Sequence, residues 1–326
     1  MKKLLKVLLI LVVIVIVAIG GIFLYVSSFL PNIDAPDDLV VEATPEHIEH
    51  GRYLANELMG CVGCHATRDY SMFAGPINEE SKGAGGEKWD NTNGFPGSLY
   101  APNITPAALQ DWTDGEIFRA ITAGVDKDGN ALFPIMPYLQ YGKLPKEDIY
   151  DVIAYLRTIK PAHNEYPERK LDFPLNLIVN LMPKEGTHEL KLDKSNPIKY
   201  GEYLVTAAAC YDCHTKMDDK GQFVPGMDFA GGMEFNLSTG GVVRSANLTP
   251  DKETGIGNWT EEKFIKRFTL YSDSSYTPHK VIPGEFNTYM PWEYYCKLKE
   301  DDLKAMYAFF MSTNPVQNEV VKFTGN

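Results

Sequence analysis

Two copies of a Cys-x-x-Cys-His motif are the feature of this 326-residue chain that points most directly to chemistry. They read Cys61-Val62-Gly63-Cys64-His65 and Cys210-Tyr211-Asp212-Cys213-His214. Two thiols at positions i and i+3 can form thioethers with the vinyl groups of haem, while the adjacent imidazole binds the iron. Each copy therefore predicts one covalently bound haem c. The predicted attachment points are Cys61, Cys64, Cys210 and Cys213, and the predicted proximal ligands are His65 and His214.

Three other uses of paired cysteines fit the sequence less well. A thioredoxin-like motif needs a βαβ context, and a zinc site needs a further Cys or His pair at ligand spacing, but neither accompanies these motifs. Structural disulfides would explain neither the histidine after each pair nor the repeat that surrounds it. The fifth cysteine, Cys296, has no such motif and is predicted to be a small buried apolar residue.

The second axial ligand of each iron has to come from elsewhere, and methionine is the candidate that repeats. Met136 lies 71 residues after His65 and Met290 lies 76 residues after His214, each followed by proline. A thioether is a soft, neutral ligand that favours ferrous iron and raises its potential. The alternatives are another methionine, a methionine that only fills core space, or His279 as a ligand of the second iron.

The motifs lie in two copies of a longer segment, residues 51–161 and 201–315. The matching landmarks are Gly51-Arg52-Tyr53-Leu54 with Gly201-Glu202-Tyr203-Leu204, Asn103-Ile104-Thr105-Pro106 with Asn247-Leu248-Thr249-Pro250, and Met136-Pro137-Tyr138 with Met290-Pro291-Trp292. Only Met136 and Met290, among the eleven methionines, occupy matching positions between a Trp-Thr pair and a terminal helix. The duplication therefore favours these two as distal ligands.

Three helices are predicted in each copy to position these residues. Thr44 and Pro45 are an N-cap and first residue for a helix up to Gly60, and Thr113 with Glu116 forms a capping box for the next helix. The terminal helices carry an i, i+3, i+4, i+7 apolar pattern, at Ile149, Val152, Ile153 and Leu156 and again at Leu303, Met306, Tyr307 and Phe310. Long Gly- and Pro-rich connections leave little apolar core, which a haem would supply.

An uncharged stretch of 20 residues, 7–26, is long enough to span a bilayer as a helix. Its flanking charges are Lys2, Lys3 and Lys6 before it and Asp34, Asp37 and Asp38 after it. The positive-inside rule then places the N-terminus in the cytoplasm and the rest of the chain outside. A cleaved signal peptide is the alternative, because Ala18-Ile19-Gly20 is a small-x-small triplet.

The predicted fold is mainly α, with two tandem domains after an N-terminal transmembrane helix. The predicted boundaries are 1–26 for a basic tip and anchor, 27–43 for a linker, 44–161 and 198–316 for the domains, 162–197 for an interdomain segment and 317–326 for a tail. An apolar stretch, 173–182, predicts a short helix packed between the domains, with a second membrane contact as the alternative. The segment Gly75-Pro76 is predicted to offer a carbonyl to the second ring nitrogen of His65.

The charge balance excludes one class of partner. The chain has 31 basic and 43 acidic residues, a net charge of −12. Three lysines precede the apolar run, so 28 basic and 43 acidic residues remain after it, a net charge of −15. Nucleic acid is therefore not expected to bind, because phosphate recognition needs a basic surface, and basic protein partners are favoured.

Further motifs follow the first Cys-x-x-Cys-His in a fixed order: Ala101-Pro102-Asn103-Ile104-Thr105-Pro106, Trp112-Thr113-Asp114, Gly124-Val125-Asp126 and Met136-Pro137-Tyr138. With a haem motif, a later Met-Pro and a terminal amphipathic helix, each half resembles a class I cytochrome c domain. Through the motifs just named, the chain more closely resembles the haem subunits of bacterial membrane-bound quinoprotein alcohol and flavoprotein gluconate dehydrogenases. The chain differs from that family in having two haem domains rather than three and an N-terminal anchor. The resemblance implies that electrons arrive from a periplasmic dehydrogenase and leave towards quinone or a terminal oxidase.

These observations predict a dihaem cytochrome c, anchored in the bacterial inner membrane with its haem domains in the periplasm, that relays single electrons. Its expected partners are the membrane and redox proteins such as a dehydrogenase, a terminal oxidase or another cytochrome. Catalysis on a substrate is not expected, because both axial positions of each iron would be filled. The alternative is a dihaem cytochrome c peroxidase, which needs one open or labile iron, and a methionine in both copies argues against it.

Overall fold

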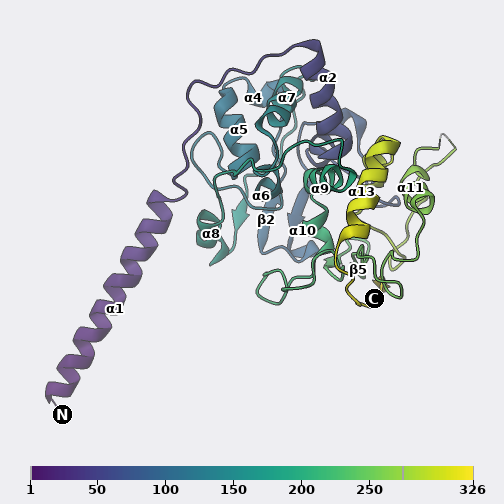
Figure 1. The fold of residues 1–326 in the computed structure, drawn as a ribbon. Helices are drawn as coiled ribbons and strands as arrows, with labels where there is room; N and C mark the ends of the chain where they lie inside the picture. The colour runs from purple at the N-terminus through teal and green to yellow at the C-terminus, as the bar shows by residue number, and fades with distance from the viewer. Residues whose placement is uncertain (1, 274, 326) are drawn as a thin grey trace.

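The computed structural model describes residues 2–273 and 275–325. One long helix, α1 (Lys2–Phe29), projects from a mainly helical body (Figure 1). α1 has 28 residues, none of them buried, and is long and apolar enough to cross a membrane. A signal sequence would form the same kind of helix, so both interpretations of the N-terminal segment predict it.

The helices of the body occur in a repeated order. The first half contains α2 (Pro45–Tyr53), a π-helical turn (Leu54–Leu58), α3 (Cys61–Cys64), α4 (Pro106–Leu109), α5 (Asp114–Ala123), α6 (Tyr138–Tyr141) and α7 (Lys146–Leu156). The second half contains α9 (Pro197–Ala207), α10 (Cys210–His214), α11 (Glu261–Thr269), α12 (Trp292–Tyr295) and α13 (Glu300–Ser312). The predicted caps are confirmed, because the Thr44 hydroxyl accepts from the backbone N–H of His47 and Thr113 forms a capping box with Glu116.

The first and last helices of each half cross at a glycine. A Cβ atom on Gly51 in α2 would lie 1.8 Å from the carbonyl oxygen of Asp151 in α7. A Cβ atom on Gly201 in α9 would lie 2.0 Å from the carbonyl oxygen of Ala305 in α13. Only glycine allows such close backbone approach. The apolar residues predicted to face the core do so at Ile149, Val152, Ile153, Leu156, Leu303, Met306 and Phe310, all buried, while Tyr307 is half-buried.

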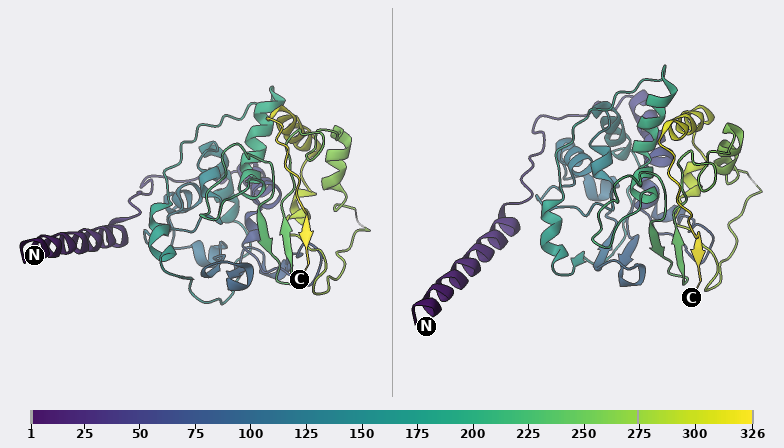
Figure 2. Two further views of the ribbon diagram at one scale, coloured as in Figure 1. Left: turned by 90° about the horizontal axis from the view of Figure 1, so that it is seen from below. Right: turned by 60° about the horizontal axis from the view of Figure 1, so that its bottom comes forward.

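Each half also contains a small antiparallel sheet that the sequence patterns do not predict. The sheets are β1 (Lys88–Asp90), β2 (Gly97–Tyr100) and β3 (Lys170–Leu171), and β4 (Glu234–Asn236), β5 (Val242–Arg244) and β6 (Phe323–Thr324). In each sheet the third strand comes from chain that follows the terminal helix, and β6 lies beside β5 at the C-terminal end of the molecule (Figure 2). Strands of two to four residues are too short to show an alternating pattern.

Reciprocal contacts join the two halves. Tyr53 in α2 donates a hydrogen bond to Asp302 in α13, and Tyr203 in α9 approaches Asp148 in α7. The repeat aligns Tyr53 with Tyr203 and Asp148 with Asp302, so the same kind of contact is made twice in opposite directions. Such reciprocity is the property of an approximate two-fold axis. Buried residues of both halves form one continuous apolar cluster.

The predicted short helix in the segment between the halves is present as α8 (Leu175–Ile178), followed by a 3-10 turn (Val179–Leu181). Its neighbours are the end of α1 and strand β3 (Figure 1), and the Asn180 side chain donates to the carbonyl of Val26 at 3.3 Å. The helix is therefore confirmed, but its predicted position between the two domains is wrong. Leu181 stays exposed beside α1, at 56% of its surface, and Phe173, just before α8, is 77% exposed.

The glycine crossing generates a stability prediction. We expect Gly201→Ala to lower the free energy of unfolding by about 1–3 kcal/mol, because the added methyl group would force α9 and α13 apart. Urea unfolding of the full chain in detergent, followed by helical circular dichroism, measures this change. Glu202→Ala is the control, since Glu202 is the exposed neighbour in the same helix and should change stability by less than about 0.5 kcal/mol. An unchanged midpoint in Gly201→Ala would contradict the close crossing.

Candidate functional site

Both Cys-x-x-Cys-His motifs form one short helical turn after a left-handed residue. Gly60, with φ of 68°, precedes α3, and Ala209, with φ of 50°, precedes α10. This abrupt turn separates each motif from the helix before it and is the same in both halves. All four motif thiols are free, and burial raises the pKa of Cys61 and Cys210 to about 12. None of the four thiols is in a disulfide, so each pair is available for thioether formation with a haem.

The motif histidines are buried and held in one orientation. The Nδ1 atom of His65 lies 2.7 Å from the carbonyl oxygen of Pro102, and that of His214 lies 2.8 Å from the carbonyl oxygen of Ala246. Burial lowers the pKa of both imidazoles and therefore favours their neutral form. A neutral ring that donates through Nδ1 presents Nε2 as its metal-binding lone pair. Both histidines therefore fit the part of an iron ligand.

The predicted carbonyl partner of His65, in Gly75-Pro76, is wrong. The carbonyl of Gly75 accepts from the Arg68 side chain at 2.7 Å, and that of Pro76 accepts from the backbone N–H of Asp69 at 3.0 Å. Both carbonyl oxygens therefore already accept hydrogen bonds from residues close by in sequence, and neither is bound to His65. Spacing from the histidine was therefore a poor guide to its partner.

A repeated Asn-x-Thr turn positions the carbonyls that hold the histidines. Asn247 follows Ala246, and its Oδ1 accepts from the backbone N–H and hydroxyl of Thr249 at 2.9 and 2.7 Å. Its Nδ2 donates at 2.8 Å to the carbonyl of Val316, beyond the terminal helix. The same three bonds join Asn103 to Thr105, at 2.8 and 2.8 Å, and to Ala162, at 2.7 Å. Comparing the two copies at this landmark, rather than counting from the histidine, would have found the carbonyls.

The two candidate distal methionines have the same backbone setting. Met136 and Met290 are half-buried at the margin of the apolar cluster, directly before α6 and α12. Each accepts a hydrogen bond from the residue two positions later, at 2.8 Å for Met136 and 2.9 Å for Met290. The ring of His279, the alternative ligand, is exposed and stacks on Phe73 at 4.9 Å. Cys296 is buried, as predicted, and its thiol donates to the carbonyl of Glu293.

Each half places a side chain on the motif of the other half. Gln140 in α6 donates to Asp212, the third residue of the second motif, at 2.7 Å. Tyr294 in α12 covers the first motif so closely that a Cβ on Gly60 or Gly63 would lie 2.5 or 2.9 Å from its ring carbons. The repeat aligns Gln140 with Tyr294 and Gly63 with Asp212. The two motifs therefore meet across the approximate two-fold axis.

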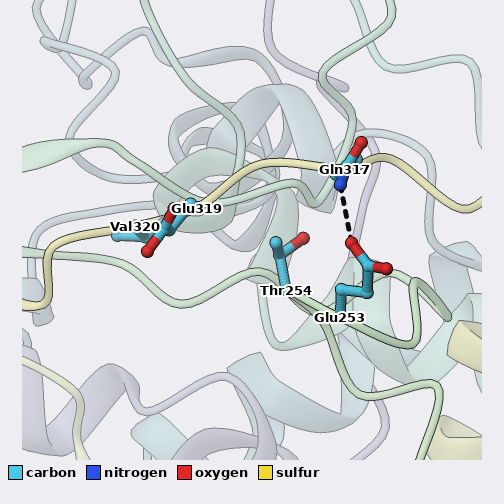
Figure 3. Close-up of a pocket in the computed structure, with 5 residues that line it drawn as sticks. All are labelled: Glu253, Thr254, Gln317, Glu319 and Val320. Atoms are coloured by element: carbon cyan, nitrogen blue, oxygen red, sulfur yellow. Dashed lines mark hydrogen bonds between the residues drawn. The ribbon is translucent and has the colours of Figure 1, made fainter.

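A separate cavity of about 600 Å³ lies in the second half, away from the motifs (Figure 3). It is lined by Glu253, Thr254, Gln317, Glu319 and Val320. The side chain of Gln317 donates to Glu253 at 2.8 Å across it. Its lining contains no motif residue and is mainly polar, so it is not part of the candidate haem sites.

No protein-family model matches the chain. The cytochrome c subunit of the quinone alcohol dehydrogenase of Gluconacetobacter polyoxogenes is 28% identical over 82% of this chain and 56% of its own length. The cytochrome c subunit of the gluconate 2-dehydrogenase of Pantoea cypripedii is 25% identical over 72% of this chain and 53% of its own length. A diheme cytochrome c-type protein of Cereibacter sphaeroides is 28% identical over 66% of this chain and 72% of its own length.

The chain spans about half the length of the two dehydrogenase subunits, whereas its match to the diheme protein covers most of that relative. The shared name of these relatives implies covalently bound haem c, which fits the free thiols and the oriented histidines described above. Over most of its length the chain is thus homologous to cytochrome c subunits of alcohol, fructose and gluconate dehydrogenases and to a diheme cytochrome c.

Proposed function

We propose that this chain is a membrane-anchored dihaem cytochrome c that relays single electrons. The observation that carries the proposal is the repeated pair of a free Cys-x-x-Cys and a buried histidine whose Nδ1 is bound to a backbone carbonyl. Haem c, when bound, supplies an Fe(III)/Fe(II) couple. The proposed attachment residues are Cys61, Cys64, Cys210 and Cys213, and the proposed axial ligands are His65 with Met136 and His214 with Met290.

The residues around each motif have positioning roles in this function. The Pro102 and Ala246 carbonyls fix the tautomer of the histidines, so that each histidine would present Nε2 to a haem iron. Met136 and Met290 would each supply a neutral thioether as the second ligand, which would leave the iron no free position for a substrate. The proposal is therefore an electron-transfer protein without catalytic activity of its own, and the peroxidase alternative is not favoured.

The proposed domains are residues 44–161 and 198–316, arranged as tandem class I cytochrome c domains. The glycine crossings of α2 with α7 and of α9 with α13 support this division, because each half packs its own first helix against its own terminal helix. The strands β3 and β6 extend each unit beyond its terminal helix.

The reciprocal motif contact supports electron transfer inside the chain. Electron tunnelling weakens steeply as the separation of donor and acceptor grows. Because Gln140 reaches Asp212 and Tyr294 covers Gly60 and Gly63, the attachment edges of both sites lie at the same interface. We call this contact between the two motifs the junction. Tyr294 is its aromatic member, and we assign Tyr294 a positioning role there.

The proposed location is the bacterial inner membrane, with the body in the periplasm and α1 retained as the anchor. Exposed apolar side chains of Ile178 and Leu181 lie in the elements that contact the end of α1, where the membrane surface would be. The proposed electron donor is a periplasmic dehydrogenase and the proposed acceptor is quinone, a terminal oxidase or another cytochrome. A net charge of −15 outside the anchor favours partners with a basic docking surface.

The ligand assignment predicts that Met136→Ala and Met290→Ala each change the visible spectrum of one haem and lower its midpoint potential, because a thioether stabilises ferrous iron. Covalent haem staining and a pyridine haemochrome count should first give two haems per chain. Met311→Ala, in the last turn of α13, is the control and should change neither spectrum. Unchanged spectra in one of the two variants would mean that another residue binds that iron.

High-spin haem with rapid peroxide turnover in the wild-type protein would favour the peroxidase.

The junction predicts that Tyr294→Leu slows electron exchange between the two haems several-fold, while both haems and their spectra remain. Flash photolysis of the half-reduced protein measures the exchange rate. Tyr294→Phe keeps the ring over Gly60 and Gly63 and is the matched control, with a rate close to that of the wild type. An equal rate in the leucine variant, with two haems bound, would exclude Tyr294 from the junction.

A further inference from the structure

Four side chains at the crossing of α2 and α7 have no part in the proposed function. His47 and His50 lie three residues apart on α2, and Asp148 and Asp151 lie three residues apart on α7. Residues at this spacing share one face of a helix, so each helix presents a pair. The Gly51 crossing brings the two pairs together. We call these four residues the crossing cluster.

Ligand-type atoms of three members of the crossing cluster, His50, Asp148 and Asp151, lie within 4.8 Å of one another. The Nδ1 atom of His50 is 2.7 Å from Oδ2 of Asp151 and 3.9 Å from Oδ1 of Asp148. The Nδ1 atom of His47 is 3.3 Å from Oδ1 of Asp151. Zinc with bonds of about 2.0–2.1 Å in a tetrahedral site separates its ligand atoms by roughly 3.3 Å. Small side-chain rotations would therefore bring His50, Asp148 and Asp151 around one ion. His47 is a fourth candidate ligand, because it contacts Asp151 from the rim.

The innermost member of the crossing cluster has an unsatisfied oxygen. Asp148 is only 4% exposed, and its Oδ2 has no hydrogen-bond partner among the residues that the structure describes. Tyr203 approaches this carboxyl from the other half without satisfying Oδ2, and burial raises the pKa of Asp148. Within the described chain, the ion pairs of Asp148 and Asp151 involve histidine and no lysine or arginine. A buried carboxylate oxygen without a donor is costly, and a cation bound to this carboxyl would reduce that cost.

The second half provides an internal comparison. Asp302, which the repeat aligns with Asp148, accepts from Tyr200 at 2.6 Å on Oδ1 and from Tyr53 on Oδ2. His50 aligns with Tyr200, and the remaining positions of the cluster align with Pro197 and Ala305. The second half therefore lacks three of the four ligand-type side chains and satisfies its carboxylate with two phenols. Of the two aligned crossings, the one whose aspartate keeps an unsatisfied oxygen is the one with the ligand-type residues.

We propose that the crossing cluster binds one divalent transition-metal ion of the zinc type. Two imidazoles with two carboxylates suit zinc and its first-row neighbours, whereas calcium and magnesium prefer sites made of oxygen ligands alone. The ion joins α2 to α7 and neutralises the carboxylate that faces Tyr203, so it stabilises both the first half and its contact with the second. The inference does not depend on haem binding.

The test uses the full-length haem-loaded protein in detergent. The protein is treated with EDTA, incubated with zinc chloride and dialysed. The amount of zinc per chain is then measured by inductively coupled plasma mass spectrometry. We expect one zinc ion per chain and a higher thermal midpoint in its presence, and we expect His50→Gln and Asp151→Asn to lose both. His163→Gln, which changes an exposed histidine outside the cluster, should retain both.

Two results would overturn the proposal. One is a wild-type protein that retains no zinc after dialysis, and the other is a His50→Gln variant that folds normally and retains as much zinc as the wild type. If the circular dichroism of His50→Gln departs from that of the wild type, His47→Gln decides, because His47 is at the rim with 42% of its side chain exposed. Failure of the dihaem function would appear separately, as a low haem count in the wild-type protein.

Discussion

The hydrogen bond from a motif histidine to a backbone carbonyl is the interaction on which the rest of each half depends. It selects the neutral tautomer that can bind iron through Nε2, and it requires a carbonyl at the right place in an irregular loop. The Asn-x-Thr turn supplies that place by tying the loop to the chain beyond the terminal helix. The terminal helix is held in turn by its crossing with the first helix at Gly51 or Gly201.

The two halves share this series of contacts, whereas other aligned positions differ between them. Both halves retain the histidine, the carbonyl, the Asn-x-Thr turn and the glycine crossing. Other aligned positions have diverged. Gln140, at the contact between the halves, aligns with Tyr294. His50, which contacts Asp151 within the first half, aligns with Tyr200. An approximate two-fold arrangement tolerates such differences, because each side of a reciprocal contact can use a different pair. The divergence makes the two motif environments unequal and leaves Asp148 without the donor that Asp302 has.

Sequence patterns were reliable where the controlling interaction is local. The Thr44 cap, the Thr113–Glu116 capping box and the apolar faces of the terminal helices each depend on residues within two turns of one another. The strands, the neighbours of α8 and the carbonyl partner of His65 depend on chain that is distant in sequence. β3 and β6 exist only because β2 and β5 offer an edge, and the Pro102 carbonyl is 37 residues from the ring it holds. Periodicity contains no information about such pairings.

The sequence by itself determined the presence of the two Cys-x-x-Cys-His motifs, their duplication, the apolar N-terminal segment and the helical class of the fold, because each follows from residue type at short spacing. Only the tertiary structure decided which carbonyl orients each histidine, that the two motifs meet through Gln140 and Tyr294, and that two histidines face two aspartates across the α2–α7 crossing. These arrangements join residues up to a few hundred positions apart, and they are set by the packing of whole helices at glycine crossings and across the two-fold contact.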